Sequence, residues 1–278
     1  MNWPKNVLMS DPSFFDIEYA INTHMVDNDG NLNTIDQKKA FTQWKALKDK
    51  FSELGLKVHL LDPVDGLPDM VFTANQTLPF LRDDETHFIL SHMHHPQRQD
   101  EVQYFKSWIE KNGYKNIDLV TPMSFEGMGD ALWNYETGEL FGGFGFRTKE
   151  EMYAEVENHI GLKINKLTLT NINFYHLDTC LAIVNKDTAF YVPVGFDEDS
   201  IKILKDKFAN LIEIPEEEAI KGFAANLCAV NGSDIIIQKN NPITCEAAEA
   251  TGLKVHTVDT SEFMKSGGSV FCMKQLFW

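Results

Sequence analysis

The chain has few cysteines and no long hydrophobic run. Its four cysteines, Cys180, Cys228, Cys245 and Cys272, are widely separated and form no C-x-x-C pair. This spacing supports neither a disulfide framework nor a zinc site built from cysteines. No apolar stretch approaches the ~18 residues that a membrane-spanning helix needs. We therefore expect a cytoplasmic protein with no membrane partner.

Positive charge is also scarce. The 25 Lys and Arg residues face 41 Asp and Glu residues, which gives a formal net charge of −16 and a pI of about 4.9. Nucleic-acid binding depends on basic residues that neutralise phosphates, so this balance argues against a nucleic-acid partner. The hydrophobic share of 43% and the charged share of 24% are typical of globular proteins. No linker-like or low-complexity segment divides the chain, which predicts a single domain over residues 1–278.

The same order of features occurs five times: an amphipathic helix, a residue that can end it, and a short strand. The helices are expected at about 35–54, 98–112, 148–160, 197–209 and 242–251, and the strands at 56–62, 116–121, 162–169, 211–214 and 253–258. Glycines stand at four of the helix ends, and Asn210 takes that place in the fourth repeat. Thr148 and Glu151 have the spacing of a capping box at the start of the third helix.

This pattern indicates five α/β blocks arranged in a ring. A non-repetitive α/β domain, in which helices and strands merely alternate, remains the alternative. All-β propellers have repeats of similar length, but the five amphipathic helices argue against them.

Five turns rich in small residues follow the helix and strand units, at 72–75, 126–130, 176–179, 224–227 and 267–272. Quasi-equivalent turns would all converge on the axis of the ring. They carry the carboxylates of Glu126 and Asp130, the imidazole of His176 with the carboxylate of Asp178, and the thiol of Cys272. Covalent cysteine catalysis needs these parts: a nucleophile, a proton carrier and acids that hold a substrate.

Each of these residues also has an ordinary structural explanation. Unpaired cysteines are commonly buried packing groups, which is what we expect of the other three cysteines. Cys272 differs because glycines at 267 and 268 allow a ligand or backbone to approach closely. His176 lies among apolar residues and could be a structural histidine, and Glu126 could be a simple turn residue. Strand-like alternation would place the side chains of His176 and Asp178 on one face.

Taken together, segments 125–130 and 176–179 and the late Cys272 resemble the guanidine-modifying, or pentein, superfamily, which includes arginine deiminase and dimethylarginine dimethylaminohydrolase. The resemblance covers nearly the whole chain. It implies a five-bladed α/β propeller of ββαβ modules around a pseudo-fivefold axis. It also implies a catalytic set of Cys272, His176 and Glu126, with Asp178 as a carboxylate that holds the substrate.

More closely, segments 20–22, 72–75, 174–180 and 223–226 look like the arginine dihydrolase branch, which converts arginine to ornithine. Classical deiminases carry an aspartate where this chain has Asn75. An aspartate pairs with a guanidinium cation, whereas an amide can also donate to the carbonyl oxygen of a neutral ureido group. Asn75 therefore favours an enzyme that processes citrulline, either as an intermediate from arginine or as its sole substrate.

Other residues are assigned to the substrate mainly by resemblance. Arg98 and Arg147 resemble arginines that clamp the carboxylate of a free amino acid, although Arg98 could instead begin a solvated helix face. Asn22 would contact the α-amino end or the head group, and Asp130 is a further substrate-binding candidate. The competing functions are dimethylargininase, an arginine deiminase that stops at citrulline, and a non-catalytic propeller that binds a ligand.

No metal or organic cofactor is expected. His92, His94 and His95 are bunched on one segment without a carboxylate at ligand spacing. The glycines of 142–145 lack the spacing of a dinucleotide-binding loop. The expected partner is a small molecule of the arginine family, and the sequence is compatible with a homo-oligomer.

Overall fold

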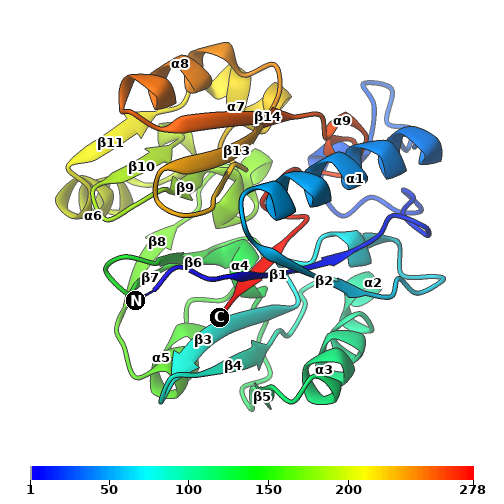
Figure 1. Ribbon diagram of the computed structural model, residues 1–278, viewed down its shortest axis with the longest axis horizontal. Coiled ribbons are helices and arrows are strands. Elements are labelled where there is room, and N and C mark those ends of the chain that lie inside the picture. Colours follow the sequence, from blue (N-terminus) through cyan, green and yellow to red (C-terminus); the bar gives the residue numbers. More distant parts are fainter. Residues whose placement is uncertain (1) are drawn as a thin grey trace.

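Five three-stranded sheets of one design make up the computed structural model, which describes residues 2–278 (Figure 1). In each sheet the central strand pairs antiparallel with one neighbour and parallel with the other. The central strands are β1 (Asn6–Ser10), β4 (Glu85–Leu90), β7 (Glu139–Phe144), β10 (Thr188–Tyr191) and β13 (Asp234–Gln238). Their antiparallel partners are β15 (Gln275–Phe277), β3 (Thr77–Arg82), β6 (Ala131–Asn134), β9 (Leu181–Ile183) and β12 (Cys228–Ala229).

The parallel partners follow the central strands through a helix, because two parallel neighbours need a crossover connection. These strands are β2 (Lys57–Leu61), β5 (Lys115–Ile117), β8 (Ile164–Thr168), β11 (Asn210–Glu213) and β14 (Lys254–Val258). The crossover helices are α1 (Gln37–Glu53), α3 (Val102–Lys111), α5 (Met152–Ile160), α6 (Glu198–Lys207) and α8 (Pro242–Ala250). The expected succession of ββαβ modules is therefore present five times.

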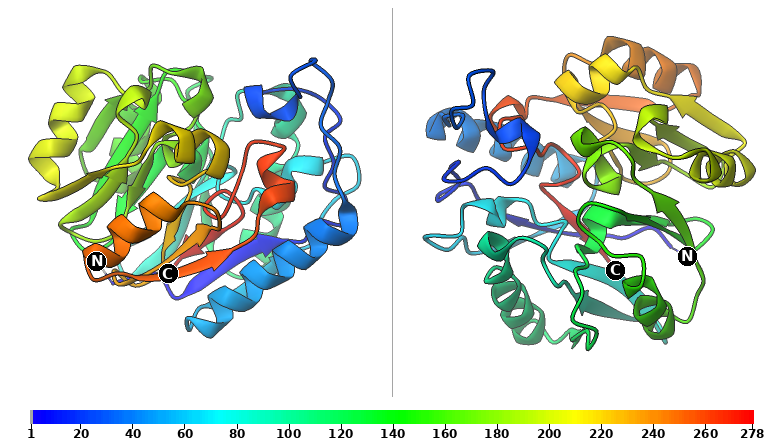
Figure 2. Two further views of the ribbon diagram at one scale, coloured as in Figure 1. Left: turned by 90° about the horizontal axis from the view of Figure 1, so that it is seen from above. Right: turned by 180° about the vertical axis from the view of Figure 1, so that it is seen from behind.

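One module joins the two ends of the chain. Asn6 in β1 pairs with Phe277 in β15 and with Lys57 in β2, and the two termini lie close together in Figure 1. The C-terminal segment, coloured red, runs through the middle of the molecule in both views of Figure 2. This path carries the turn that contains Cys272 into the centre of the ring.

A short helical segment precedes each antiparallel partner strand. These segments are η2 (Pro68–Val71), α4 (Gly127–Asp130), η4 (Leu177–Thr179), α7 (Glu216–Gly222) and α9 (Ser261–Met264). They occupy equivalent places in the five modules, so the residues at or just after them meet near the axis. The remaining short segments are η1 (Thr23–Met25), α2 (Pro96–Gln99), η3 (Ile172–Phe174) and η5 (Pro193–Gly195).

The crossover helices pack their apolar faces against the sheets. In α1 the buried residues Ala40, Trp44, Leu47 and Phe51 recur every three or four positions, so they form one stripe along the helix. At the end of α1, Gly55 has φ +86°, which a residue with a side chain rarely adopts. The periodicity and the stop thus predicted this helix to within two residues at each end.

Three local expectations were wrong. The segment expected as one helix over 98–112 is divided into α2 and α3. Thr148 does not cap α5, because its hydroxyl accepts a hydrogen bond from the backbone N–H of Glu126 instead. Asn210 does not end α6, because the helix stops at Lys207 and Asn210 already belongs to β11.

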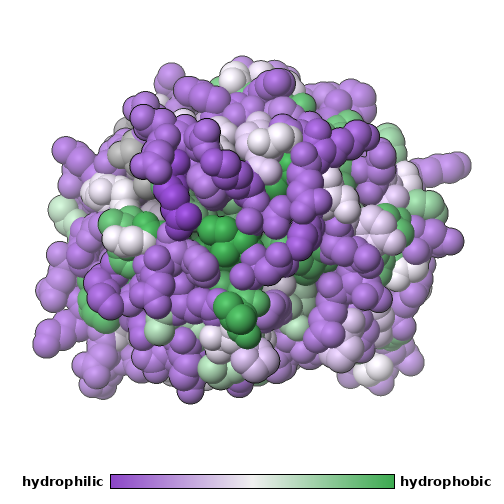
Figure 3. Space-filling model, turned by 90° about the horizontal axis from the view of Figure 1, so that it is seen from below, coloured by the Kyte–Doolittle hydropathy of each residue, from purple (hydrophilic) through white to green (hydrophobic). Residues whose placement is uncertain are grey.

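Hydrophilic side chains cover most of the face in Figure 3, and the hydrophobic ones form small groups, the clearest of which lies near its middle. Large exposed hydrophobic residues include Val120, Ile172 and Ile243. Within residues 2–278, no helix is both long enough and apolar enough to cross a membrane. The oligomeric state stays a prediction.

Candidate active site

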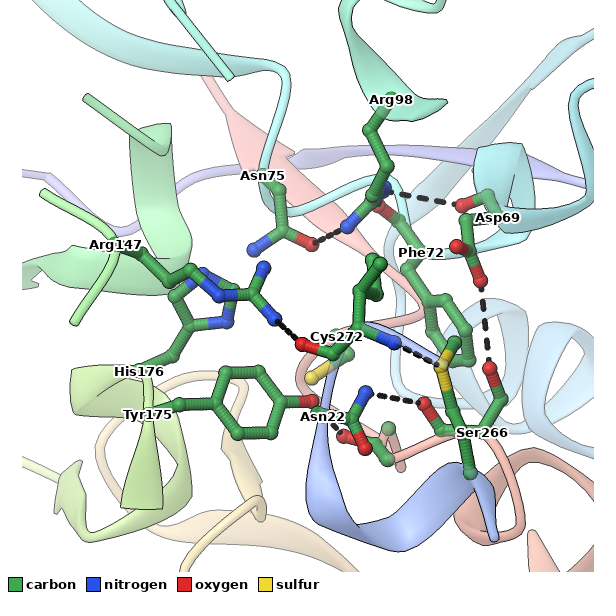
Figure 4. A pocket seen from close by; sticks show the side chains of 14 residues that line it. Asn22, Asp69, Phe72, Asn75, Arg98, Arg147, Tyr175, His176, Ser266 and Cys272 are labelled. Atoms are coloured by element: carbon green, nitrogen blue, oxygen red, sulfur yellow. Dashed lines mark hydrogen bonds between the residues drawn. The ribbon is translucent and has the colours of Figure 1, made fainter. Parts of the chain in front are cut away.

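A pocket of about 300 Å³ lies where the turns meet, and 14 residues between Ile21 and Cys272 line it (Figure 4). Six of the nine residues assigned from the sequence either line the pocket or face it through their polar groups: Asn22, Asn75, Arg98, Arg147, His176 and Cys272. Glu126 contacts the lining residues His176 and Arg147, and Asp178 contacts the lining residue Cys272.

The sulfur of Cys272 has two polar partners. Its thiol donates to Oδ2 of Asp178 at 3.2 Å, and the amide Nδ2 of Asn226 donates to the sulfur at 3.2 Å. Cys272 is only 3% exposed. The nucleophile expected from the sequence therefore faces both a carboxylate and an amide donor.

Asn226 holds the turn of the nucleophile in place. Its Oδ1 accepts hydrogen bonds from the backbone N–H groups of Ser269, Phe271 and Cys272, at 3.1, 3.0 and 3.2 Å. Its Nδ2 also donates to the backbone oxygen of Asp178 at 3.0 Å. We assigned no role to Asn226 from the sequence, although its turn was among the five that we expected to converge.

His176 and Glu126 form a buried pair. The Nε2 of His176 lies 2.6 Å from Oε2 of Glu126, and Nη1 of Arg147 lies 3.4 Å from the same oxygen. The other oxygen, Oε1, accepts from the backbone N–H of His94 at 2.9 Å. Glu126 thus orients the imidazole, while Arg147 and His94 orient Glu126.

The turn that begins with Glu126 depends on glycine. Gly127 has φ +48°, and a Cβ there would lie 2.5 Å from the backbone oxygen of Thr77. A Cβ on Gly129 would lie 2.2 Å from Nδ2 of Asn75. Only glycines allow this turn to approach Asn75 so closely.

Burial and neighbouring charges shift the pKa values of the acids and the thiol. Burial raises the pKa of Glu126, but the charges of Arg147 and His176 outweigh it and hold this pKa well below its usual range. Burial raises the pKa of Asp178 to about 7. Burial and the nearby Asp178 carboxylate raise the pKa of the Cys272 thiol well above its ordinary value. This raised pKa favours the protonated form of the Cys272 thiol near neutral pH.

His176 and Asp178 do not lie on a strand. His176 precedes η4, and Asp178 lies within that short helix. Consequently the two side chains point to different partners, His176 to Glu126 and Asp178 to Cys272. The expectation that strand alternation would direct them the same way was wrong, although both reach the site.

Arg98 fixes the orientation of Asn75. A guanidinium group only donates, so the atom that accepts from Nη1 of Arg98 at 3.1 Å must be Oδ1 of Asn75. The Nδ2 of Asn75 is then left buried without a hydrogen-bond partner, on the side away from Arg98 in Figure 4. Arg98 itself is 4% exposed and pairs with Glu101 at 2.9 Å. The alternative that Arg98 begins a solvated helix face was wrong.

Arg147 and Asn22 line another part of the pocket. The Arg147 guanidinium lies 4.6 Å from the ring centre of Tyr175, and its Nη2 donates to the backbone oxygen of Ile21 at 2.8 Å. Nδ2 of Asn22 donates to the backbone oxygen of Ser266 at 3.0 Å. A planar cation held on an aromatic face is well suited to a carboxylate.

Asp130 is not among the residues that line the pocket. Its Oδ1 accepts from the backbone N–H of Leu177 at 3.0 Å, and burial raises its pKa to about 6. This contact joins α4 to η4, so it fixes the turn of His176. The structure gives Asp130 this contact in place of the direct approach to the pocket that we expected.

Asp69 lines the pocket and was missed in the sequence. Its carboxylate accepts from the hydroxyl groups of Tyr19 at 2.8 Å and Ser266 at 3.4 Å, and the residue is 2% exposed. Asp69 belongs to η2, just before the turn 72–75 that we had singled out. The sequence signal that could have identified Asp69 is an acidic residue close to a turn expected to converge on the axis.

No group of three potential metal ligands occurs among His, Cys, Asp and Glu of residues 2–278. In the histidine segment, Nδ1 of His92 lies 3.1 Å from the backbone oxygen of Thr121.

The other three cysteines differ in burial. Burial raises the pKa of the Cys180 thiol well above its ordinary value and that of the Cys228 thiol to about 11. The remaining thiol, Cys245, is partly exposed.

Comparisons with known proteins agree with this fold. The family model described as N,N dimethylarginine dimethylhydrolase, eukaryotic, matches residues 11–276. The bifunctional arginine dihydrolase/ornithine cyclodeaminase ArgZ of Synechocystis sp. is 35% identical over 271 residues, which are 96% of this chain and 37% of ArgZ. N(G),N(G)-dimethylarginine dimethylaminohydrolase of Mycobacterium tuberculosis is 33% identical over 265 residues, 95% of this chain and 83% of that protein.

A crystal structure of the N-terminal domain of ArgZ, a cysteine-to-serine mutant bound to substrate, has a TM-score of 0.90 at 33% identity. It covers 98% of this chain and 97% of that domain. The chain spans little more than a third of the full length of ArgZ.

The fold and the comparisons define an α/β-propeller hydrolase of the pentein superfamily, which acts on C–N bonds. Within that superfamily the chain belongs to the dimethylarginine dimethylaminohydrolase family. The predicted superfamily, fold class and enzyme class are therefore confirmed.

Proposed function

We propose that residues 1–278 form a single catalytic domain that hydrolyses free arginine to ornithine through citrulline, with Cys272 as the nucleophile. The observation that carries the proposal is the meeting of Cys272, Asp178 and the His176–Glu126 pair at one pocket. The likeness over 96% of this chain to a bifunctional arginine dihydrolase supports arginine as the starting substrate.

The guanidinium group of arginine brings a positive charge next to the Cys272 thiol. A cation beside Cys272 and Asp178 lowers the pKa of both, because it stabilises their ionised forms. Oδ1 of Asp178 is buried without a hydrogen-bond partner and can accept from a guanidinium N–H. Binding of arginine and formation of the thiolate are therefore coupled.

The first reaction replaces one nitrogen by oxygen. The sulfur of Cys272 bonds to the central carbon, and the electron pair of the C=N bond moves to nitrogen. His176 then donates a proton to the departing ammonia, and the carbon stays bonded to sulfur as a thiouronium adduct. Neutral His176 takes a proton from water, whose oxygen bonds to the carbon, and the C–S bond breaks to release citrulline and the thiolate.

The second reaction cleaves citrulline on the same sulfur. Cys272 attacks the ureido carbon, His176 protonates the leaving amine, and ornithine departs. Water then cleaves the resulting S-carbamoyl group, which yields carbamate that decomposes to ammonia and carbon dioxide. Each reaction consumes one water molecule.

Asn75 is suited to this second substrate. Because Arg98 occupies Oδ1, the buried Nδ2 of Asn75 is left as a donor. The ureido group of citrulline offers a carbonyl oxygen, which a donor can bind, whereas the guanidinium group of arginine carries only donors. The fixed amide therefore favours binding of citrulline and the developing charge on its oxygen.

The amino-acid end of the substrate has separate partners. Arg147, stacked on Tyr175, binds the α-carboxylate. The buried carboxylate of Asp69 and the carbonyl end of Asn22 are placed for the α-amino group. This arrangement selects a free amino acid over a residue within a peptide chain.

Dimethylargininase is the second candidate, because the matching family model carries that description and a relative from Mycobacterium tuberculosis bears that name. Incubation of the purified protein with arginine, citrulline or dimethylarginine, followed by separation of citrulline from ornithine, distinguishes the candidates. We expect ornithine from both arginine and citrulline, and none with Cys272→Ala. Citrulline as the final product from arginine would reject the dihydrolase proposal, and citrulline from dimethylarginine alone would favour the second candidate.

A further inference from the structure

Glu101 is a fully buried carboxylate, 0% exposed, between α2 and α3. It is not among the residues that line the pocket, and the mechanism above gives it no step. A carboxylate removed from water costs free energy unless it is paired and hydrogen-bonded. Its partners, Arg98 and Gln76, connect it to the site.

The Glu101 carboxylate holds two of the three nitrogens of the Arg98 guanidinium. Nε donates to Oε1 at 3.0 Å and to Oε2 at 3.2 Å, and Nη2 donates to Oε2 at 2.9 Å. Nη2 also donates to the backbone oxygens of Asp69 at 3.1 Å and Phe72 at 3.3 Å. These backbone oxygens alone would let the planar group pivot about Nη2. Because Glu101 holds Nε as well, the position of the third nitrogen, Nη1, is fixed.

The same carboxylate is tied to the residue next to Asn75. Nε2 of Gln76 donates to Oε2 of Glu101 at 2.6 Å. The backbone here is held by Ser91, whose hydroxyl donates to the oxygen of Asn75 at 2.6 Å and whose N–H donates to the oxygen of Gln76 at 3.0 Å. A chain of hydrogen bonds therefore begins at Gln76, passes through the carboxylate and the guanidinium, and ends at the neighbouring Asn75.

The charge of Arg98 is secured by its acidic neighbours. Burial lowers the pKa of Arg98, but the charges of Glu101 and Asp69 outweigh it and raise this pKa above its usual value. Burial raises the pKa of Glu101, and the charge of Arg98 opposes this rise. A guanidinium cation only donates, so Nη1 accepts no orientation of the Asn75 amide except the one that presents Oδ1.

We propose that Glu101 is a positioning residue that, through Arg98, fixes the Asn75 amide with Nδ2 toward the substrate and so favours citrulline over arginine at this contact. The last torsion of asparagine is roughly two-fold, so a free amide can turn over. With Nδ2 forward it donates to a ureido oxygen, and with Oδ1 forward it accepts from a guanidinium. Glu101 decides between these two orientations. Its effect on turnover rests on the proposed function, whereas its effect on binding does not.

The first test measures binding to protein that carries Cys272→Ala, so that neither substrate is consumed. Calorimetry gives Kd for citrulline and for arginine, with Glu101 intact and with Glu101→Gln. Glutamine keeps the volume but removes the charge and one acceptor, so the paired contact with Arg98 is lost and the Asn75 amide can turn. We expect Kd for citrulline to rise about tenfold and Kd for arginine to change by less than about threefold.

Glu218→Gln is the matched control. Glu218 is a buried carboxylate that accepts from the backbone N–H groups of Ile243 at 2.8 Å and Thr244 at 2.9 Å, at the start of α8. Its substitution should lower the melting temperature and leave the ratio of the two Kd values unchanged. The same change of ratio in this variant would mean that Glu101 acts only through stability.

Asn75→Asp tests whether the effect of Glu101 passes through the amide. A carboxylate presents oxygen in either orientation, so it has no orientation to lose. Adding Glu101→Gln to Asn75→Asp should therefore leave the ratio of Kd values as it is in Asn75→Asp alone. The double variant should also melt higher than Glu101→Gln, because the new carboxylate compensates Arg98. A further loss of selectivity as large as that of Glu101→Gln alone would reject the proposed route.

Gln76→Met weakens the same network while it keeps the ion pair, so it serves if Glu101→Gln does not fold. We expect it to raise the ratio of Kd for citrulline to Kd for arginine about threefold. An unchanged ratio in the folded variants, or failure of both to fold, would reject the positioning role. With Cys272 present, Glu101→Gln should accumulate citrulline from arginine. A changed Kd ratio in a protein that never releases ornithine would support this role and reject the dihydrolase function.

Discussion

Oδ2 of Asp178 lies 3.2 Å from the sulfur of Cys272 and accepts a hydrogen bond from its thiol. Burial and this carboxylate raise the pKa of the thiol. These two influences favour the protonated form of the thiol, so in the proposed mechanism a substrate must change the local charge before Cys272 can attack. This coupling makes the reactivity of Cys272 depend on Asp178, and several measurements follow from it.

Asp178→Asn should make Cys272 easier to ionise. The substitution removes a negative charge next to the sulfur, so the pH midpoint of Cys272 alkylation should fall by about one unit. Turnover of arginine should nevertheless fall about 10²-fold, because the substrate loses a charged partner. Alkylation followed by mass spectrometry measures the first effect. A midpoint that rises or stays fixed would show that Asp178 does not control the thiol.

Ionisation of Asp178 and ionisation of Glu126 should change the free energy of unfolding with pH in opposite directions. The pKa of Asp178 is raised to about 7 in the native state, so between pH 4 and 7 the native state keeps a proton that the unfolded chain has lost. The unfolding free energy therefore decreases as the pH rises through this range. Asp178→Asn should remove this loss and be more stable than the parent at pH 8 by about 1–4 kcal/mol.

Glu126→Gln provides the contrast. The pKa of Glu126 is lowered in the native state, so its stabilisation is present above pH 4.5 and is lost as the pH falls. The substitution should cost more at pH 7 than at pH 3. Urea unfolding of both variants at several pH values measures these trends. Parallel pH profiles for the two variants would contradict the assigned pKa directions.

Asn226→Ala should lower both stability and activity. It removes the acceptor of three backbone N–H groups and the donor to the Cys272 sulfur. We expect a loss of about 1–3 kcal/mol in the free energy of unfolding. A displaced nucleophile should also reduce kcat/KM about 10²-fold.

Asn241→Ala is the matched control for Asn226. Asn241 is 1% exposed, and its Nδ2 donates to the backbone oxygens of Gly222 and Gln238 at 2.8 Å. Its loss should destabilise the protein by a similar amount and leave the activity of the folded fraction nearly unchanged. Equal losses of specific activity in both variants would mean that Asn226 acts only through stability.

Asn75→Asp should separate the two reactions. A carboxylate at this position pairs with a guanidinium but cannot donate to a ureido oxygen. We expect arginine consumption to continue and citrulline to accumulate, with kcat/KM for citrulline reduced at least about tenfold, the equivalent of 1.4 kcal/mol. Chromatography of the products over time detects the change. Undiminished ornithine formation would remove Asn75 as the determinant of the second step.

Arg147→Lys should weaken substrate binding. Lysine keeps the charge but loses the planar stacking on Tyr175 and the paired donors. We expect KM for arginine to rise about tenfold, with a smaller change in kcat. Arg82→Lys, at an exposed position at the end of β3, is the control and should leave KM unchanged. An unaltered KM in Arg147→Lys would place the α-carboxylate elsewhere.

The repeat and the four helix ends marked by glycine were predictable from the sequence because each depends on local chemistry. Amphipathic spacing such as that of Ala40, Trp44 and Leu47 predicts a helix, and glycine at its end predicts the stop. Together with the spacing of the five turns, these signals indicated the ring. The same turns identified Cys272 and His176 as candidates, because few other residue types can perform nucleophilic catalysis and proton transfer.

The tertiary structure alone decided the contacts between modules. Thr148 does not cap a helix as predicted, because the fold brings the backbone N–H of Glu126 close enough to donate to its hydroxyl. The structural role of Asn226 depends on the three backbone N–H groups that it binds in a turn more than 40 residues later in the chain. Local propensity says which residues form an element, but hydrogen bonds and charges between distant turns depend on distances that only the closed ring establishes.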